Sequence, residues 1–323
     1  MHKQIVMTRP LLPAAQQKLI DHHFDIKVWE ETVPISRQLL MEWLQHAEGL
    51  VVDGSVIVDE QLLEAAPNLQ VIVQPAVGYD NIDINACTRR GIPVGNTPGV
   101  LVEATADLTF GLLLCAVRRI HEGWDFVRQG KWQTNQNIPF GLDLYGKTLG
   151  IVGMGRIGAA VARRAQAFGM KVIYYNRKQR LDEQKLGVIY SSLDHLLEQA
   201  DCIIVLSPLS PETQGMFSWE QFAKMKPTAY FVNAARGPIV DTAALVDALT
   251  TNKIAYAALD VTNPEPLYGE HPLLKLPNVL ITPHIGSATV ETRNRMALLT
   301  ADNLLAGMAR QPLPACVNSE VYK

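Results

Sequence analysis

The chain of 323 residues lacks the features that mark several large classes of protein. It has no basic excess, because 29 Lys and Arg stand against 32 Asp and Glu, a formal net charge of −3. A nucleic-acid partner is therefore not expected, since such partners require a concentration of positive charge. The four cysteines occur singly, without a Cys-x-x-Cys pair or the spacing of metal ligands. We predict free thiols in a reducing compartment and no metal site.

Long hydrophobic runs are missing as well. The longest apolar stretch, Leu108–Val117, is too short to cross a bilayer and contains Thr109 and Gly111. Residues 1–10 contain no apolar segment of the signal-peptide type. We therefore expect a cytoplasmic protein with no membrane partner. Hydrophobic residues make up 48% of the chain, which is enough for a large core, and its length favours two domains.

Short β-branched segments alternate with helical patterns along almost the whole chain. Strands are predicted in the first third at Gln4–Thr8, Asp25–Val28, Gly49–Val52, Gln70–Gln74 and Ile92–Val94. A second series is predicted at Thr148–Val152, Lys171–Tyr175, Gly187–Tyr190, Cys202–Leu206, Ala229–Val232, Ile254–Leu259 and Val279–Ile281. Strands separated by helices form βαβ units, so the pattern predicts two parallel α/β units.

Helical patterns fill most of the intervals between these strands. They include Leu12–Phe24, Gln38–His46 and a long apolar stripe that follows Gly99. The Asn-, Gln-, Pro- and Gly-rich segment Gln133–Tyr145 predicts a loop. The last helical pattern, Thr289–Met308, could return to either unit, and periodicity alone does not assign it.

A glycine motif predicts a nucleotide site. Gly153, Gly155 and Gly158 follow the strand that ends at Val152 and open the helix 159–168. In this setting the three glycines permit a tight turn, close approach of a pyrophosphate and close packing of helix on strand. The N–H groups at the start of the helix, around Arg156 and Ile157, can bind phosphates. A turn without a ligand is the alternative.

The residues after the next strand bear on the choice of cofactor. An NAD-binding site usually has a carboxylate there, and this chain has Asn176 followed by Arg177 and Lys178, with Arg180 close behind. A carboxylate repels a 2′-phosphate by about 4 kcal/mol per charge pair at about 4 Å and an effective dielectric near 20. We therefore predict that NADP(H) is preferred and that NAD(H) remains possible. The alternative is a solvated basic turn.

Three charged residues follow three consecutive predicted strands. Arg236 comes after Ala229–Val232, Glu265 after Ile254–Leu259 and His284 after Val279–Ile281. Ligands of open parallel sheets bind at the carboxyl ends of the strands, so these side chains are expected to gather there. An arginine can hold a carboxylate, a histidine can transfer a proton, and a carboxylate can orient that histidine. Together they suit the reduction of a 2-oxo acid by a nicotinamide cofactor.

The motifs around these residues resemble the D-isomer-specific 2-hydroxyacid dehydrogenase family. The resemblance covers most of the chain and rests on GMGRIG at 153–158, NAARG at 233–237, DVTNPEPL at 260–267 and PHIGSAT at 283–289. PEPL and HIGSAT most resemble the glyoxylate/hydroxypyruvate reductase branch, some bacterial members of which also reduce 2-ketogluconate. The family fold implies two doubly wound parallel-sheet domains. A Rossmann cofactor domain, residues 99–289, is inserted into a flavodoxin-like substrate domain, residues 1–98 and 290–323.

The resemblance also implies roles for single residues. It implies catalytic roles for Arg236, Glu265 and His284. Backbone N–H groups of Val77 and Gly78 are implied to bind the substrate carboxylate, with Ser287 as a hydroxyl on the substrate side. Cofactor contacts are implied for Thr105, Ser207, Ala234, Asp260 and Gly286. Asp260 would receive the nicotinamide amide, although a helix- or loop-capping role is also a reasonable interpretation.

The family is usually dimeric through the segment that corresponds to Leu101–Tyr145, so a homodimer is expected. The main functional hypothesis is an NADPH-dependent reductase of glyoxylate and hydroxypyruvate. One alternative keeps the enzyme and changes the substrate, to 2-ketogluconate or another sugar acid; 3-phosphohydroxypyruvate ranks lower because Val51–Val58 and Gln74–Tyr79 offer no cation. A second alternative is a nucleotide-sensing binding protein of the same fold.

Overall fold

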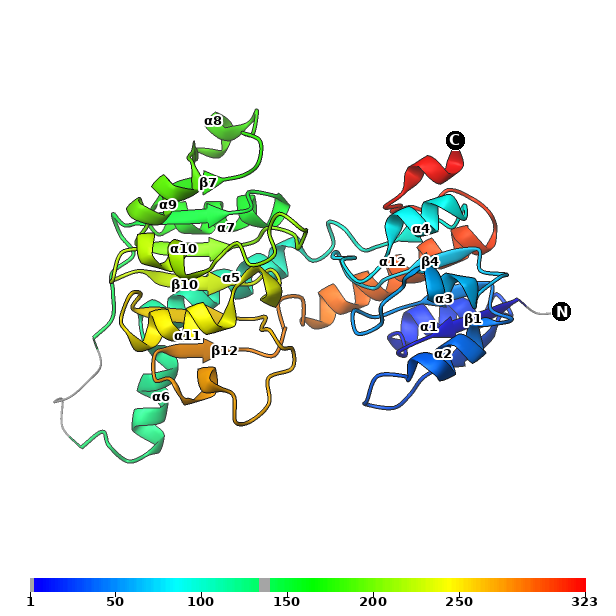
Figure 1. Ribbon diagram of the computed structural model, residues 1–323, viewed down its shortest axis with the longest axis horizontal. Helices are drawn as coiled ribbons and strands as arrows, with labels where there is room; N and C mark the ends of the chain where they lie inside the picture. The colour runs from blue at the N-terminus through cyan, green and yellow to red at the C-terminus, as the bar shows by residue number, and fades with distance from the viewer. Residues whose placement is uncertain (1–2, 134–139) are drawn as a thin grey trace. The chain divides into compact units, whose positions relative to one another are not determined.

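The computed structural model describes residues 3–133 and 140–323. Contacts divide the chain into two compact units, of which one comprises Met1–Leu101 with Ser287–Lys323 and the other Val102–Gly286. The first unit is therefore built from both ends of the chain, and the second is inserted between them (Figure 1).

The first unit is organised around a five-stranded sheet in the order β2-β1-β3-β4-β5. Every neighbouring pair is parallel, and the order is that of flavodoxin-like sheets. The strands are β1 (Gln4–Met7), β2 (Asp25–Val28), β3 (Gly49–Val51), β4 (Val71–Val73) and β5 (Val94–Gly95).

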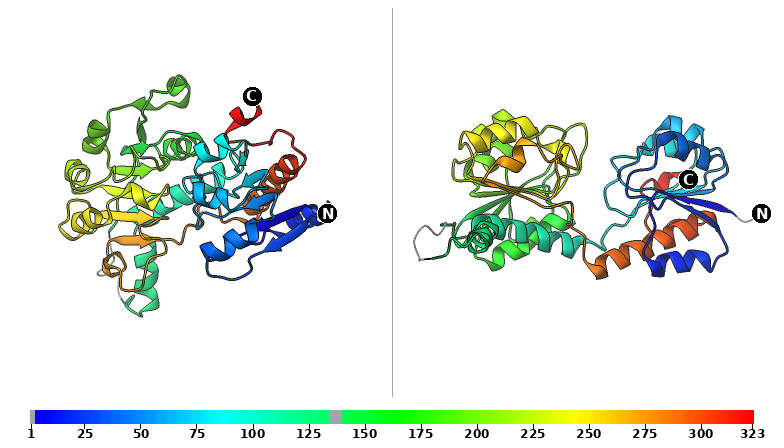
Figure 2. Two further views of the ribbon diagram at one scale, coloured as in Figure 1. Left: turned by 45° about the vertical axis from the view of Figure 1, so that its right-hand side comes forward. Right: turned by 90° about the horizontal axis from the view of Figure 1, so that it is seen from below.

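Helices cover both faces of this sheet (Figure 2). One face carries α1 (Pro13–Ile20) and α12 (Val290–Met308), whose apolar residues share a buried cluster with β1 and β4. The other face carries α2 (Arg37–Leu44), α3 (Glu60–Glu64) and α4 (Ile84–Arg89), which share a second cluster. A short 3₁₀ turn, η3 (Ser319–Tyr322), ends the chain.

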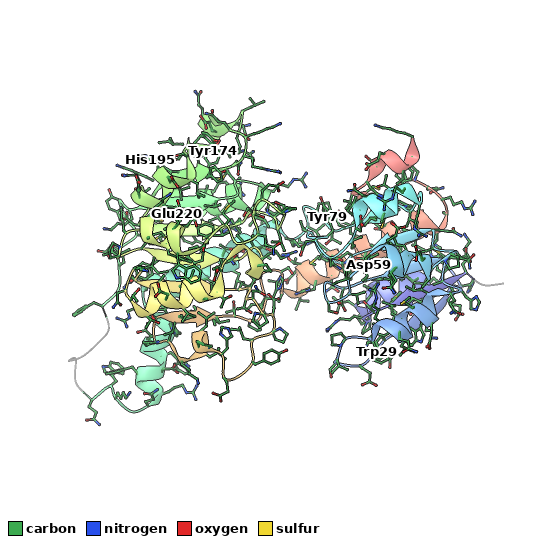
Figure 3. The ribbon with its side chains drawn as sticks, in the orientation of Figure 1. Trp29, Asp59, Tyr79, Tyr174, His195 and Glu220 are labelled. Carbon is green, nitrogen blue, oxygen red and sulfur yellow. The ribbon has the colours of Figure 1, made fainter. Side chains whose placement is uncertain are left out.

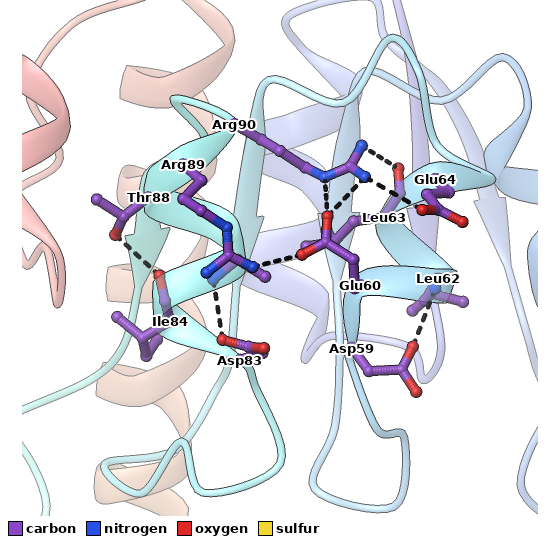
Figure 4. A network of polar contacts seen from close by, with 11 residues as sticks. Asp59, Glu60, Leu62, Leu63, Glu64, Asp83, Ile84, Thr88, Arg89 and Arg90 are labelled. Carbon is purple, nitrogen blue, oxygen red and sulfur yellow. Dashed lines mark hydrogen bonds and ion pairs between the residues drawn. The ribbon is translucent and has the colours of Figure 1, made fainter.

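Ion pairs hold α3 and α4 together, as Figure 4 shows. Glu60 on α3 accepts hydrogen bonds from Arg89 at the end of α4 and from Arg90 just beyond it. These hydrogen bonds keep the pKa of Glu60 below its ordinary value, and the bond from Arg90 has the larger effect. Asp83 caps α4 by accepting the N–H of Ala86. The helix that follows the β4–α4 loop is thereby fixed in place.

The second unit contains a seven-stranded parallel sheet in the order β12-β11-β10-β9-β6-β7-β8. The strand order reverses direction between β6 and β9, which is the switch point at which doubly wound sheets bind nucleotides. The strands are β6 (Thr148–Val152), β7 (Lys171–Tyr175), β8 (Ile189–Tyr190), β9 (Cys202–Val205), β10 (Tyr230–Asn233), β11 (Tyr256–Leu259) and β12 (Val279–Ile281).

Two helical layers enclose this sheet (Figure 2). On one face lie α5 (Val102–Val117) and α7 (Arg156–Ala167), and on the other α9 (Leu193–Gln199), α10 (Trp219–Lys224) and α11 (Thr242–Thr250). Two helices, α6 (Ile120–Arg128) and α8 (Glu183–Leu186), bury no residue. The 3₁₀ turns are η1 (Gly237–Ile239) and η2 (Pro272–Lys275).

The predicted fold class, two doubly wound parallel sheets, is confirmed. Each predicted strand overlaps an observed one, and the final helix, which periodicity left open, packs in the first unit. The predicted loop 133–145 falls in part on residues 134–139, outside the described residues. Within 3–133 and 140–323, no helix is both long and apolar enough to cross a membrane. The same ranges contain no group of three potential metal-ligating side chains.

Candidate active site

The three charged residues singled out from the sequence follow adjacent strands of the second unit. Arg236 follows β10, Glu265 follows β11 and His284 follows β12, and these strands are neighbours in the sheet. Because all of them are parallel, the residues that follow them leave the sheet at the same carboxyl edge. The glycine turn after β6 lies at that edge too.

Glu265 and His284 form a hydrogen-bonded pair. Glu265 Oε1 lies 2.7 Å from His284 Nδ1, and Glu265 Oε2 accepts the N–H of Thr262 at 3.2 Å. Burial raises the pKa of Glu265, but hydrogen bonds from His284 and Thr262 and the charge of Arg236 outweigh it, so the pKa lies below its ordinary value. The ionised carboxylate makes Nδ1 the donor and leaves Nε2 for a ligand.

The backbone around His284 has an unusual shape, which Asp260 maintains. His284 adopts φ 53°, in the left-handed region that few residues other than glycine occupy. Its N–H donates to the carbonyl of Asp260 at 2.9 Å. The carboxylate of Asp260, which is 2% exposed, accepts the Thr282 hydroxyl and the N–H groups of Ile285 and Gly286 at 2.6–2.9 Å. One buried side chain thus fixes the segment on both sides of the histidine.

Arg236 lies on a loop that is shaped by Asn233. The Asn233 side chain is buried; its oxygen accepts the N–H of Ala235, and its nitrogen donates to the carbonyl of Arg236. A Cβ at Gly237 would lie 1.8 Å from the carbonyl oxygen of Thr262. Only glycine therefore lets the β10 loop approach the β11 loop this closely, and Arg236 acts electrostatically on Glu265 as a result.

The glycine turn has the geometry that a dinucleotide requires. Gly153 adopts φ +104°, and a Cβ there would lie 2.3 Å from the nitrogen of Ser207. A Cβ at Gly158 would lie 2.6 Å from the carbonyl oxygen of Gly153, whereas no atom lies within 4 Å of the Cβ position of Gly155. The first and third glycines allow close packing, and the second faces open space. Helix α7 begins at Arg156 with no side-chain cap, so its first N–H groups can bind an anion.

The other predicted cofactor contacts lie in the same unit. Ser207 follows β9 at the switch point, and its buried hydroxyl has no partner among the described residues, as expected for a side chain awaiting a ligand. Ala234 follows β10. Gly286 and Thr105 are neighbours, because a Cβ on Gly286 would lie 3.3 Å from the Thr105 methyl group. These observations fit a bound nicotinamide dinucleotide.

The cations in the turn after β7 differ in whether the structure shows an acidic partner for them. Asn176 binds the glycine turn directly, since its Oδ1 accepts the N–H of Met154 at 2.7 Å. Arg180 donates to the Met154 carbonyl and pairs with Asp182, so its charge is largely matched. Arg177 and Lys178 are exposed at the same turn. They are the cations best placed to meet an added phosphate.

The predicted substrate-side residues belong to the other unit. Val77 and Gly78 are half-buried in the loop between β4 and α4. Ser287 begins the C-terminal segment of that unit, and its carbonyl accepts the N–H of Thr289 ahead of α12. Their proposed contacts with a substrate remain predictions.

Sequence reasoning assigned no role to several residues that shape the site. Asn233 and Thr262 stand within the sequence motifs without a predicted role, and Thr282 stands outside them. Their position in the sequence could have indicated a role, because each stands at or just after the end of a strand. There Asn and Thr side chains form the hydrogen bonds that backbone groups no longer receive from a neighbouring strand. The loop-capping interpretation of Asp260 matches the three hydrogen bonds that its carboxylate accepts.

Comparisons with known proteins place these features in a family. Residues 110–286 match the model of the D-isomer specific 2-hydroxyacid dehydrogenase NAD binding domain. The chain is 46% identical over 326 residues to a glyoxylate reductase of Korarchaeum cryptofilum, covering 100% of this chain and 98% of that protein. It is 45% identical over 330 residues to a glyoxylate reductase of Pyrococcus furiosus, covering 100% and 97%.

Solved structures agree with the fold. A protein of Thermus thermophilus superposes with a TM-score of 0.92 at 43% identity, covering 97% of this chain and 99% of that one. An NADPH-dependent glyoxylate/hydroxypyruvate reductase of Sinorhizobium meliloti, solved with NADP and malonate, gives a TM-score of 0.87 at 34% identity, covering 99% and 98%.

Substitution of Asp260 tests its part in holding the His284 segment. Asp260→Ala removes the acceptor of two backbone N–H groups and should lower the free energy of unfolding by about 2–4 kcal/mol. Asp260→Asn retains one acceptor oxygen and should lose roughly half as much. Urea unfolding followed by circular dichroism measures both, and an alanine variant as stable as the parent would contradict the assignment.

Proposed function

The chain belongs to the D-isomer-specific 2-hydroxyacid dehydrogenase family, and we propose that it reduces glyoxylate and hydroxypyruvate to the corresponding 2-hydroxy acids with NADPH. The observation that carries the proposal is the 2.7 Å hydrogen bond between Glu265 and His284 at the carboxyl edge of the nucleotide-binding sheet. The names of the relatives support the substrate class, since several are glyoxylate reductases.

The chemistry divides between the cofactor and the chain. A nicotinamide dinucleotide supplies a hydride to the carbonyl carbon when it is bound. His284 then gives its Nε2 proton to the oxygen that becomes the hydroxyl, while Nδ1 stays hydrogen-bonded to Glu265. The low pKa of Glu265 keeps that carboxylate ionised at neutral pH, where it stabilises the protonated imidazole.

Arg236 recognises the acid. A guanidinium presents a planar fork of donors that matches a carboxylate and can also polarise an adjacent carbonyl. The Asn233 side chain and the close approach at Gly237 hold the Arg236 backbone for this task. In the first unit, Val77, Gly78 and Ser287 keep their proposed roles as groups that bind the substrate.

The preference for NADP(H) rests on charge. Asn176 occupies the place of the carboxylate that would repel a 2′-phosphate, and Arg177 and Lys178 are exposed beside it. One nearby acid, Asp182, is paired with Arg180 and so adds little net negative charge. The pKa of a second acid, Glu212, is lowered by the hydrogen bond from Ser210 and by the charge of Arg177. NAD(H) remains a possible second cofactor.

A homodimer through residues 101–145 is also proposed. Helix α6 buries no side chain, and its apolar residues Ile120, Trp124 and Val127 are 45–61% exposed. An unpaired apolar helix face of this kind suits a second copy of the chain. Residues 134–139 of the segment lie outside the described part.

A substrate panel with both cofactors tests the function. Glyoxylate and hydroxypyruvate should give the highest kcat/KM with NADPH, measured by loss of the absorbance of the reduced nicotinamide. His284→Ala should lose at least about a hundredfold in kcat and keep its affinity for NADPH. A higher kcat/KM for 2-ketogluconate would favour a sugar-acid reductase, and NADPH binding without turnover of any 2-oxo acid would favour a nucleotide-sensing protein.

Substituting Asn176 tests the choice of cofactor. Asn176→Asp keeps an acceptor for the Met154 N–H and adds a negative charge, so the kcat/KM ratio of NADPH to NADH should fall by at least about tenfold. Asn68→Asp, an exposed substitution of the same kind in the other unit, is the control. An unchanged ratio in the Asn176 variant would remove the electrostatic argument.

Removing the charge of Glu265 tests the proton donor. Glu265→Gln retains the side-chain shape and withdraws the stabilisation of protonated His284. Reduction at pH 7 should slow by about tenfold or more, with NADPH affinity unchanged. A variant that reduces glyoxylate at pH 7 as fast as the parent would contradict the pairing.

A further inference from the structure

The loop after β4 has three successive carbonyl groups that are held by neighbouring donors. The carbonyl of Ala76 accepts the N–H of Thr97 at 2.9 Å. The carbonyl of Val77 accepts the side-chain nitrogen of Asn96 at 2.9 Å. The carbonyl of Gly78 accepts the side-chain nitrogen of Gln74 at 2.7 Å. Three consecutive peptide groups are therefore tied to the ends of β4 and β5.

Because a peptide group is rigid, the hydrogen bonds that hold these three carbonyls also fix the direction of the N–H groups of the residues that follow them. In a trans peptide the C=O of one residue and the N–H of the next point in opposite directions. The N–H groups of Val77, Gly78 and Tyr79 therefore face away from the donors that hold the three carbonyls. None of the three has a hydrogen-bond acceptor among the described residues. Such a run of outward N–H groups is an anion-binding surface.

Gln74 carries a buried polar atom without a hydrogen bond in the described part of the chain, which lowers the stability of the fold. It is 2% exposed, and its Oε1 has no partner among the described residues. The amide cannot be turned round, because Oε1 would then face the Gly78 carbonyl. A methionine would fill a similar volume without a stranded polar atom. A buried glutamine here is explained by what its nitrogen does to the loop.

Asn96 is fixed just as firmly. Its N–H donates to the carbonyl of Ala315, and its own carbonyl accepts the side chain of Asn303 at 2.9 Å. Asn303 lies on α12 and is fully buried. The donor that orients the Val77 carbonyl is thereby anchored to a long helix.

We propose that Gln74 and Asn96 are positioning residues for the substrate carboxylate. They hold the Val77 and Gly78 carbonyls inward so that the N–H groups of Gly78 and Tyr79 stay available to a carboxylate before it arrives. The N–H of Val77 is oriented in the same way by the Ala76 carbonyl, which the N–H of Thr97 holds. Tyr79, whose own N–H belongs to this set, is labelled in Figure 3. The inference rests on the proposed reduction of 2-oxo acids and adds the residues that prepare the chain for their carboxylate.

The decisive variant is Gln74→Met. It removes one tether and the stranded oxygen together, so KM for glyoxylate should rise about threefold to tenfold, the factor that a single lost hydrogen bond gives. A contact made equally in the ground and transition states changes KM, so kcat should stay within about twofold. The midpoint of urea unfolding should be unchanged or higher. Asn96→Ala should raise KM in the same way.

A matched control lies at the opposite end of the same strand. Gln70 precedes β4 and also carries a buried Oε1 without a partner among the described residues, but its nitrogen donates to Glu48. Gln70→Met should leave KM for glyoxylate unchanged. A rise in KM equal to that of Gln74→Met would point to a general effect on the sheet and overturn the proposal.

Binding of oxalate to the NADPH-loaded protein separates this inference from the proposed function. Oxalate offers a carboxylate and no reducible carbonyl, so its dissociation constant, measured by calorimetry, should rise about threefold to tenfold in Gln74→Met with NADPH affinity unchanged. Equal oxalate affinity in parent and variant would overturn the positioning role. A parent that reduces no 2-oxo acid, but whose oxalate binding depends on Gln74, would overturn the proposed function alone.

Discussion

The carboxylate of Asp260 is the constraint on which the loops at the carboxyl edge of the second sheet depend. It is buried at the end of β11 and accepts three hydrogen bonds from the segment that follows β12. The left-handed backbone of His284 persists because the bonds on both sides determine it. With the imidazole so placed, Glu265 can reach it from the loop of the neighbouring strand. The Glu265–His284 pair is therefore a consequence of strand adjacency.

Close backbone approach is a second requirement, and glycine meets it at two places. Gly237 lets the Arg236 loop touch the loop of Glu265, and Gly153 lets the β6 turn touch Ser207 after β9. In both cases the contact joins loops from different strands. At both positions any side chain would push the two loops apart.

The sequence was most informative where a pattern repeats. Alternation of apolar strands and helices located all twelve strands of the described residues, because burial in a parallel sheet imposes a strong local signal. It also placed Arg236, Glu265 and His284 after three strands, though only the sheet order shows that these strands are neighbours. Hydrogen bonds between distant segments, such as Asn96 to Val77, left no pattern to detect. The predicted strand Ile92–Val94 overlaps β5 only at Val94, because the observed strand has just two residues.

The interleaved course of the chain has a consequence for synthesis. Helix α12 supplies Ala297, Ala301 and Leu304 to one apolar face of the first sheet, yet it leaves the ribosome only after the whole of the inserted unit. That face of the first unit therefore stays incomplete until after the inserted unit has been synthesised with all its strands. The two stretches that build the first sheet's unit are therefore synthesised on either side of the inserted unit, and the apolar face is covered only once the second stretch has appeared.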